Sequence, residues 1–143
     1  MKSPNIWWVY LSTAIALAGV AIHLGAIVGG ASWYAFFGAP PRIVASAREG
    51  TWLAPLSALF IAALMGVCVV YAGSVLGFVR RPPLQRAVLA AIAVVCMLRG
   101  LALPVLALKH LELLNTFQVI SATVWFVAGV GFAVGFSLVR TGA

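Results

Sequence analysis

The chain has 143 residues, of which 64% are hydrophobic and only 8% are charged. A soluble globular domain carries about 25% charged residues, so a soluble fold of this length would lack the interior to bury so much apolar surface. The net charge of +7 comes from nine basic residues against two acids. The basic residues flank apolar segments, where anionic headgroups attract them, and no basic run is interleaved with a recognition motif, so nucleic acid is not expected as a partner.

Four apolar segments are long enough to cross the hydrocarbon core of a bilayer, which takes about 20 residues. They cover residues 7–29, 52–78, 87–108 and 119–139. The first segment exceeds the apolar region of a signal peptide, about 7–15 residues, and is interpreted as a span. The sequence therefore predicts an all-α fold, a single transmembrane domain over residues 1–143 built as an integral membrane four-helix bundle.

The basic residues also predict the orientation of the spans. If the N-terminus is inside, five basic residues lie inside and three lie outside, together with both acids. The inside set is Lys2, Arg80, Arg81, Arg86 and Arg140, and the outside set is Arg42, Arg48 and Lys109. Because Lys and Arg concentrate in cytoplasmic loops, both termini are expected inside.

The loop between the first two spans carries structure of its own. Its aromatic residues, which are typical of an anchor at the membrane interface, are Trp33, Tyr34, Phe36 and Phe37. Pro41 suits the first position of a helix, so a short interfacial helix is expected over residues 41–49. Thr51 is expected to cap the second span.

Small residues four positions apart recur in three spans and let helix backbones approach closely in lipid. They are Gly25 and Gly29, then Ala58, Ala62 and Gly66, then Gly131 and Gly135. Packing inside one bundle accounts for them, and contact between copies in a homo-oligomer is the alternative.

Arg99 is the most informative residue, because it lies about twelve residues into the third span with apolar neighbours on both sides. A charge at that depth costs several kcal/mol unless it is paired or faces a wet cavity. Arg99 is therefore expected to face the bundle interior, where it contacts backbone carbonyls or an anionic or polar headgroup. Pro104 strengthens this expectation, since it frees the Gly100 carbonyl, and a free carbonyl at membrane depth needs a partner.

Other polar residues are expected near Arg99, at the outer end of the spans. His23 lies about 9 Å below the outer interface by helical rise. Glu49 is the best counter-ion for Arg99, and the two converge if the first loop folds down. The predicted ligand-binding residues are Arg99, His23, Glu49, Arg48, Trp52 and Trp125. The open alternatives are a histidine bonded to a neighbouring helix, an Arg48–Glu49 surface pair and aromatic residues that only pack.

Several kinds of site find no support. No zinc spacing, phosphate loop or nucleophile–base pair is visible, so no metal is expected, and enzymatic activity stays open. Haem held by two histidines is disfavoured, because His110 lies beyond the third span and His23 inside the first. Cys68 and Cys96 fall at similar depth on adjacent spans, where they either touch or act as small apolar fillers.

The layout of the chain resembles the DoxX-like group of small four-helix bacterial membrane proteins. The likeness is carried by the segment W-Y-A-F-F-G-A-P-P at Trp33–Pro41 and by Glu49, which opens the second span. The likeness covers about residues 10–105. It implies a multi-pass protein of the bacterial cytoplasmic (inner) membrane, associated with quinone and thiol redox partners.

The predicted function is binding of an amphiphilic small molecule, quinone- or lipid-like, in the outer half of the bundle, as a redox accessory. Two alternatives remain. One is a structural or assembly subunit with a membrane-protein partner, and the other is the protomer of a homo-oligomeric transporter or channel.

Overall fold

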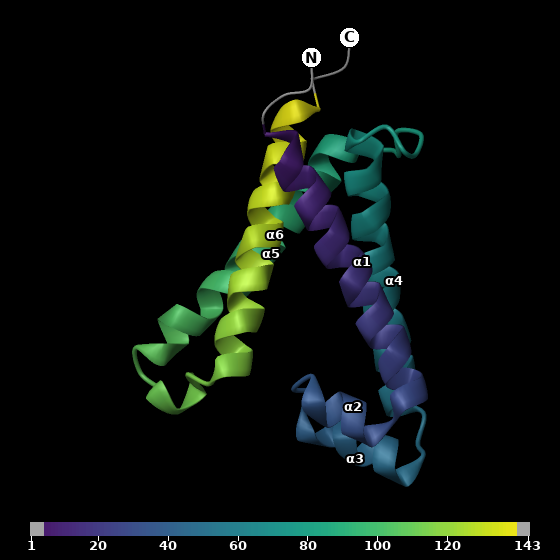
Figure 1. Ribbon diagram of the computed structural model, residues 1–143, viewed down its shortest axis with the longest axis vertical. Coiled ribbons are helices and arrows are strands. Elements are labelled where there is room, and N and C mark those ends of the chain that lie inside the picture. Colours follow the sequence, from purple (N-terminus) through teal and green to yellow (C-terminus); the bar gives the residue numbers. More distant parts are fainter. Residues whose placement is uncertain (1–4, 140–143) are drawn as a thin grey trace. The chain divides into compact units, whose positions relative to one another are not determined.

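The computed structural model describes residues 5–139, and every regular element within them is a helix. The elements are α1 (Ile6–Gly29), α2 (Ala31–Phe36), α3 (Pro41–Glu49), α4 (Leu53–Val75), α5 (Gln85–Ala107), the 3₁₀ helix η1 (Leu111–Leu113) and α6 (Thr116–Leu138) (Figure 1). The predicted interfacial helix is confirmed as α3, and another short helix, α2, precedes it. Lys2 and Arg140, two of the basic residues that predict the orientation, lie outside the described residues.

Four of the helices, α1, α4, α5 and α6, are long and apolar enough to cross a membrane. Each has 23 or 24 residues, which at the helical rise spans about 35 Å, slightly more than the hydrocarbon core. The all-α fold with four membrane spans is therefore confirmed.

The second span ends earlier than its hydrophobic pattern predicts. Helix α4 stops at Val75, because Gly77 adopts a left-handed φ of 82° that turns the chain away. The Phe78 N–H donates to the Gly73 carbonyl at 2.9 Å, which closes the helix end as in a Schellman motif. Phe78 was predicted inside the span and instead lies in the turn that follows.

The fourth span begins earlier than predicted. Helix α6 starts at Thr116 rather than at Val119. The side chain of Asn115 accepts a hydrogen bond from the Gln118 N–H at 2.9 Å, so the first turn is capped. An asparagine just ahead of an apolar run is a start signal that could have placed this boundary.

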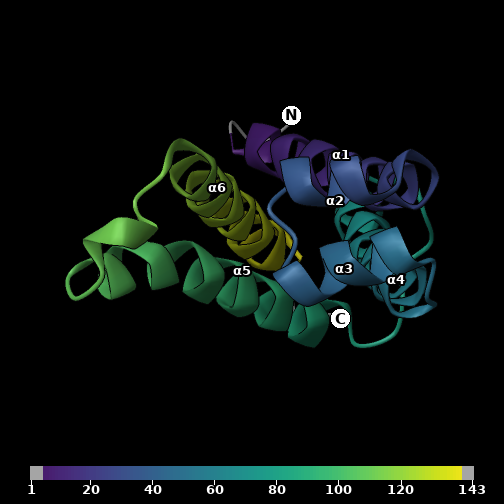
Figure 2. The ribbon, with the colours of Figure 1, turned by 90° about the horizontal axis from the view of Figure 1, so that it is seen from below.

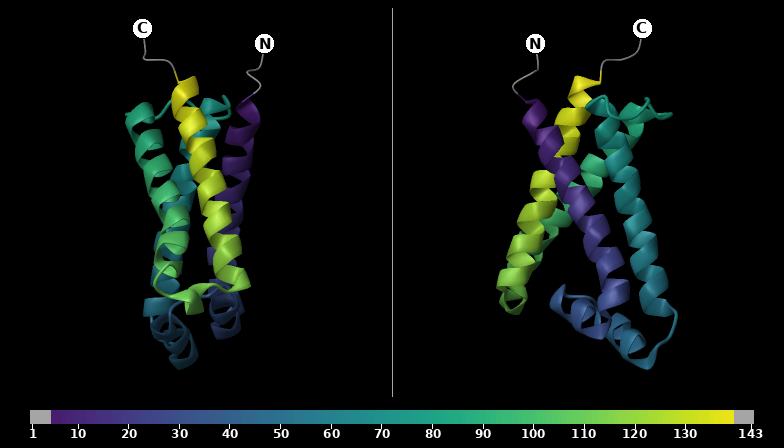
Figure 3. Two further views of the ribbon diagram at one scale, coloured as in Figure 1. Left: turned by 90° about the vertical axis from the view of Figure 1, so that its left-hand side faces the viewer. Right: turned by 45° about the vertical axis from the view of Figure 1, so that its right-hand side comes forward.

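The chain divides into two compact units. Unit 1 comprises Met1–Ala16 and Cys68–Ala143, and unit 2 is Leu17–Val67. In unit 1, α5 and α6 pack against each other (Figures 2 and 3). Its buried core consists of Val9, Ala72, Leu89, Ala93, Cys96, Ala128 and Phe132. Cys68 packs against this core from α4, and both cysteines are free thiols.

Glycines allow the helices of unit 1 to approach closely. A Cβ added at Gly100 in α5 would lie 2.8 Å from the backbone nitrogen of Phe126 in α6. A Cβ added at Gly131 in α6 would lie 2.3 Å from the carbonyl oxygen of Trp8 in α1. Both distances are far shorter than van der Waals contact. Gly131 therefore serves packing inside the unit, as the first of the two sequence alternatives predicts.

Unit 2 contains the short helices and its own core. The buried residues are Ala26, Tyr34, Ala54 and Ala58, with Ala39, Ile43, Val44 and Ala47 packed around them. Helices α2 and α3 pack against each other (Figure 2). The prediction of Tyr34 as an interface anchor is wrong, because its side chain is only 7% exposed. Trp33 and Phe36 are exposed, as an anchor requires.

The glycine pair in the first span is covered by an aromatic ring. A Cβ added at Gly29 would lie 2.2 Å from ring atoms of Trp33, and one at Gly25 would lie 2.8 Å from the same ring. The indole of Trp33 thus folds back from α2 onto α1. Within unit 2, Gly25 and Gly29 therefore make room for the Trp33 side chain and not for the backbone of another helix.

The start of α4 is capped by a residue other than the predicted one. The side-chain oxygen of Ser46, in α3, accepts a hydrogen bond from the Ala54 N–H at 2.9 Å and lies 2.6 Å from the Thr51 hydroxyl oxygen. Ser46 is 4% exposed. Thr51 bonds to Ser46 instead of to the first turn of α4, so its predicted capping role is wrong. Ser46 joins α3 to α4 within unit 2.

Ser46→Ala is expected to lower the free energy of unfolding by about 1–2 kcal/mol, because it removes a helix cap and leaves the buried Ala54 N–H without its acceptor. Unfolding of the purified protein in mixed detergent micelles measures this loss. Ser32→Ala is the matched control, since Ser32 is exposed and makes only a 3.3 Å bond to the Gly29 carbonyl. Equal losses in the two variants would contradict the proposed cap.

Candidate functional site

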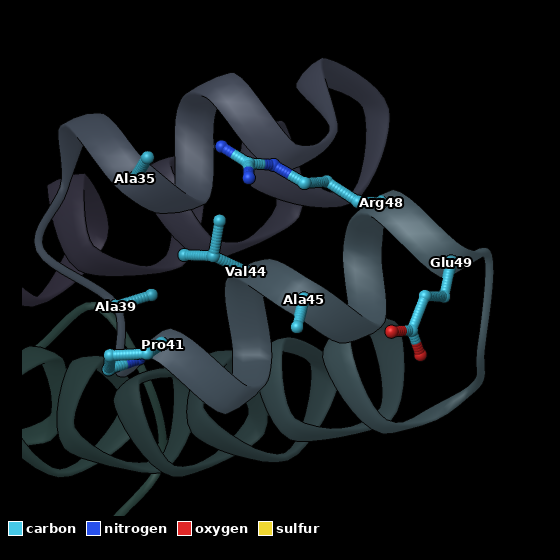
Figure 4. A pocket seen from close by; sticks show the side chains of 7 residues that line it. All are labelled: Ala35, Ala39, Pro41, Val44, Ala45, Arg48 and Glu49. Carbon is cyan, nitrogen blue, oxygen red and sulfur yellow. The ribbon is translucent and has the colours of Figure 1, made fainter.

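A hollow of about 490 Å³ lies along the α2–α3 pair of unit 2 (Figure 4). Its lining residues are Ala35, Ala39, Pro41, Val44, Ala45, Arg48 and Glu49. Five of them are apolar, and three of those are alanines whose short side chains leave space. The other two are a cation and an anion. A concave surface with an apolar wall and a few polar groups is typical of a binding site for a small molecule.

Arg48 and Glu49 occupy the last turn of α3. The helix ends there because Gly50 adopts a left-handed φ of 70° and its N–H donates to the Ser46 carbonyl. Figure 4 shows that the two charged side chains diverge: Arg48 extends back toward Val44, and Glu49 points away from it. Both side chains are exposed, and neither joins an ion pair with another residue of the range 5–139. The Arg48–Glu49 pair considered from the sequence is therefore not formed, and both charges are free to meet a ligand.

Tyr34 lies behind the apolar wall of this hollow. Ala39 and Val44 line the hollow and also pack against the buried cluster that contains Tyr34. The Tyr34 hydroxyl oxygen is buried and has no hydrogen-bond partner among the described residues. Burial raises the pKa of Tyr34, so the hydroxyl stays protonated and keeps a hydrogen to donate. The burial of Tyr34 could not be predicted from the sequence, because Tyr34 stands in an aromatic run typical of membrane interfaces.

His23 is held by its own helix. Its Nδ1 lies 2.7 Å from the Gly19 carbonyl oxygen, one turn earlier in α1. A carbonyl oxygen only accepts hydrogen bonds, so Nδ1 carries the hydrogen of this bond. The bond lies within α1 and does not join His23 to a neighbouring helix of unit 2. Nε2 is the ring nitrogen left for a contact with a ligand.

The remaining predicted site residues have separate surroundings. Trp52 is 76% exposed just before α4 in unit 2. Trp125 packs against the core of unit 1, in agreement with the packing alternative. Arg99 is exposed on α5, also in unit 1. The structure brings Arg48 and Glu49 to one hollow, and the gathering of Arg99 with His23 and Glu49 stays a prediction.

A histidine–glutamate pair lies beyond the end of α5. His110 Nδ1 is 3.0 Å from a carboxylate oxygen of Glu112, and both side chains are more than half exposed. No group of three or more histidine, cysteine or acidic side chains suited to a metal occurs among the described residues.

Comparison with known proteins adds no relative. No protein-family model matches the chain, and no curated protein or solved structure is similar to it.

Proposed function

We propose that this membrane protein binds an amphiphile, quinone- or lipid-like, in the hollow of the α2–α3 pair. The observation that supports the proposal is the make-up of that hollow: an alanine-rich wall that ends at Arg48 and Glu49. The apolar part of a ligand would lie along the wall. Its polar head would lie at the end of α3.

The two charges select complementary chemistry. The guanidinium of Arg48 offers up to five N–H donors, which suit a carbonyl, carboxylate or phosphate oxygen of the head. The carboxylate of Glu49 accepts hydrogen bonds and suits a hydroxyl or an amine. The unpartnered Tyr34 hydroxyl behind the wall offers a third polar group to a ligand or water that enters deeper. A quinone ring with its carbonyls, or a lipid headgroup, matches this set.

The cellular setting belongs to the same proposal. The likeness to DoxX-like proteins supports a bacterial cytoplasmic membrane and a redox accessory role, and the bias of basic residues supports N- and C-termini inside. In that orientation α2 and α3 lie at the outer interface, where their exposed residues Trp33 and Phe36 suit the headgroup region.

Arg48→Gln is expected to weaken amphiphile binding roughly 10- to 100-fold, because a charge-assisted hydrogen bond is worth about 1.5–3 kcal/mol. Native mass spectrometry of protein extracted gently from its own membranes reads the retained molecule directly. The matched control is Arg42→Gln, since Arg42 is exposed on the same helix, carries the same charge and does not line the hollow. Retention in Arg42→Gln and loss in Arg48→Gln would support the site.

Two results would contradict this proposal. Equal loss in both variants would show that general charge attraction holds the molecule. The second result is that wild-type protein carries no small molecule and takes up neither a short-chain quinone nor a lysolipid on titration. The hollow would then have no ligand, and a structural or assembly role would be favoured.

A further inference from the structure

A second, smaller hollow lies in unit 1, at the end of the helices where α4 turns into α5. Its volume is about 150 Å³, the space of roughly five water molecules. All four long helices contribute to its wall in this unit, through Ile6 of α1, Ser74 and Val75 of α4, Gln85 of α5 and Leu138 of α6, and Arg81 of the connecting turn and Val139 after α6 complete it. The helix ends thus border a partly open space large enough for one small polar group.

The floor of this hollow is polar and ordered. Gln85 is 8% exposed, and its side-chain amide donates to the Ser74 hydroxyl oxygen at 2.7 Å. The Ser74 hydroxyl donates in turn to the Tyr71 carbonyl at 2.7 Å. Each group is fixed by the next, so the floor is preorganised. A buried glutamine between membrane-spanning helices is unusual, because an amide is costly in apolar surroundings unless it is hydrogen-bonded.

The charged side chains of the described residues at this end of unit 1 are arginines. Arg80 and Arg81 are exposed in the turn. Arg86 is anchored, with its guanidinium carbon 4.4 Å from the centre of the Phe136 ring and a hydrogen bond to the Val139 carbonyl. The chain has only two acids, Glu49 and Glu112, and a whole span of about 35 Å separates each of them along the chain from this turn. Among the described residues of unit 1, Glu112 is the one acidic side chain, and it lies beyond the far end of α5, so no Asp or Glu side chain there neutralises these arginines.

We propose that this hollow is a binding site for a phosphate group, and that the group belongs to the headgroup of an anionic phospholipid. Arg81 at the rim supplies the charge, and the second N–H of the Gln85 side-chain amide, which the bond to Ser74 holds in place, supplies a donor to a phosphate oxygen. The apolar walls from Ile6, Val75 and Leu138 suit the glycerol and first acyl carbons, which a free phosphate lacks. This site is separate from the α2–α3 hollow and does not depend on the amphiphile proposed there.

Lipid titration of the delipidated full-length protein in mild detergent, followed by native mass spectrometry, tests this site. Wild-type protein is expected to bind phosphatidylglycerol more tightly than phosphatidylcholine. Arg81→Gln is expected to weaken phosphatidylglycerol binding about tenfold, because it removes a charge-assisted contact. Arg80→Gln is the matched control, since it removes the same charge from the adjacent position outside the hollow and is expected to change binding less than about twofold.

Three results would overturn the lipid assignment. Equal weakening by Arg80→Gln and Arg81→Gln would mean that the turn attracts anionic lipid without a site. Equal affinity of the wild type for phosphatidylglycerol and phosphatidylcholine would show that the site does not recognise the negative charge of the headgroup. Thermal stabilisation of lipid-free protein by millimolar inorganic phosphate, lost in Arg81→Gln, would assign the same anion site to a soluble phosphate compound. Unchanged unfolding temperatures of both variants without ligand confirm that they are folded.

Discussion

Gly131→Ala is expected to lower the unfolding temperature of the protein by roughly 10 °C. The added Cβ would lie 2.3 Å from the Trp8 carbonyl oxygen and 2.6 Å from the Cβ of Ser12. Both neighbours belong to α1, and Ser12 is completely buried. The backbone of α1 cannot rotate away as a side chain can, so α1 and α6 must separate and lose contact along unit 1.

The control for this prediction is Gly66→Ala. No atom lies within 4 Å of a Cβ added at Gly66, and the residue lies inside helix α4. Alanine is a better helix former than glycine by about 1 kcal/mol, so this variant is expected to be neutral or slightly more stable. Thermal unfolding in one detergent, for both variants and the wild type, measures the difference. A loss in Gly66→Ala as large as that in Gly131→Ala would refute the argument from close approach.

The spans could be predicted from the sequence because lipid imposes one simple rule on them. Each must hold about 20 apolar residues, and this composition is visible without knowledge of any partner. The ends were harder to predict. They depend on single hydrogen bonds, such as that from the Gln118 N–H to Asn115 and that from the Phe78 N–H to the Gly73 carbonyl, and such bonds leave no trace in a hydrophobic average.

Tertiary contacts were hidden for a different reason. A glycine in a span signals close approach, yet it does not name the partner: Gly29 meets an indole of its own unit, whereas Gly131 meets the backbone of α1. The sequence predicts Tyr34 to be an interface anchor because aromatic residues surround it. Its burial depends on the packing of α2 and α3 in unit 2. Ser46 caps α4 from eight residues away, a distance that local capping rules do not cover.

The candidate site was predicted in part. Arg48 and Glu49 were singled out because charges are rare in this chain, and the structure places both at one hollow. The hollow itself was not predicted, because it forms where the short side chains of Ala35, Ala39 and Ala45 leave space, and this depends on how α2 and α3 pack. An amphipathic helix 41–49 rich in alanine, next to a short second helix, is the signal that could have suggested it.

Arg99→Leu is expected to make insertion of α5 into the membrane more favourable by about 3 kcal/mol, the difference between arginine and leucine near the centre of a span. Arg99 lies eight residues before the end of α5 at Ala107, about 12 Å along the helix. It is exposed on α5, and within unit 1 it makes no hydrogen bond or ion pair with a described residue. Nothing in that unit offsets the cost of its charge.

A costly charge without a partner in its unit needs one elsewhere, either backbone carbonyls or the anionic or polar head of a bound molecule. We therefore expect Arg99→Leu to raise the unfolding temperature and to reduce the amphiphile that the protein retains. The conservative control, Arg99→Lys, keeps the charge and its cost but loses the planar fork that suits paired oxygen atoms. A lower unfolding temperature in Arg99→Leu would instead identify a structural partner outside unit 1. Unchanged stability together with unchanged ligand content would show that Arg99 does not hold the head of a bound molecule.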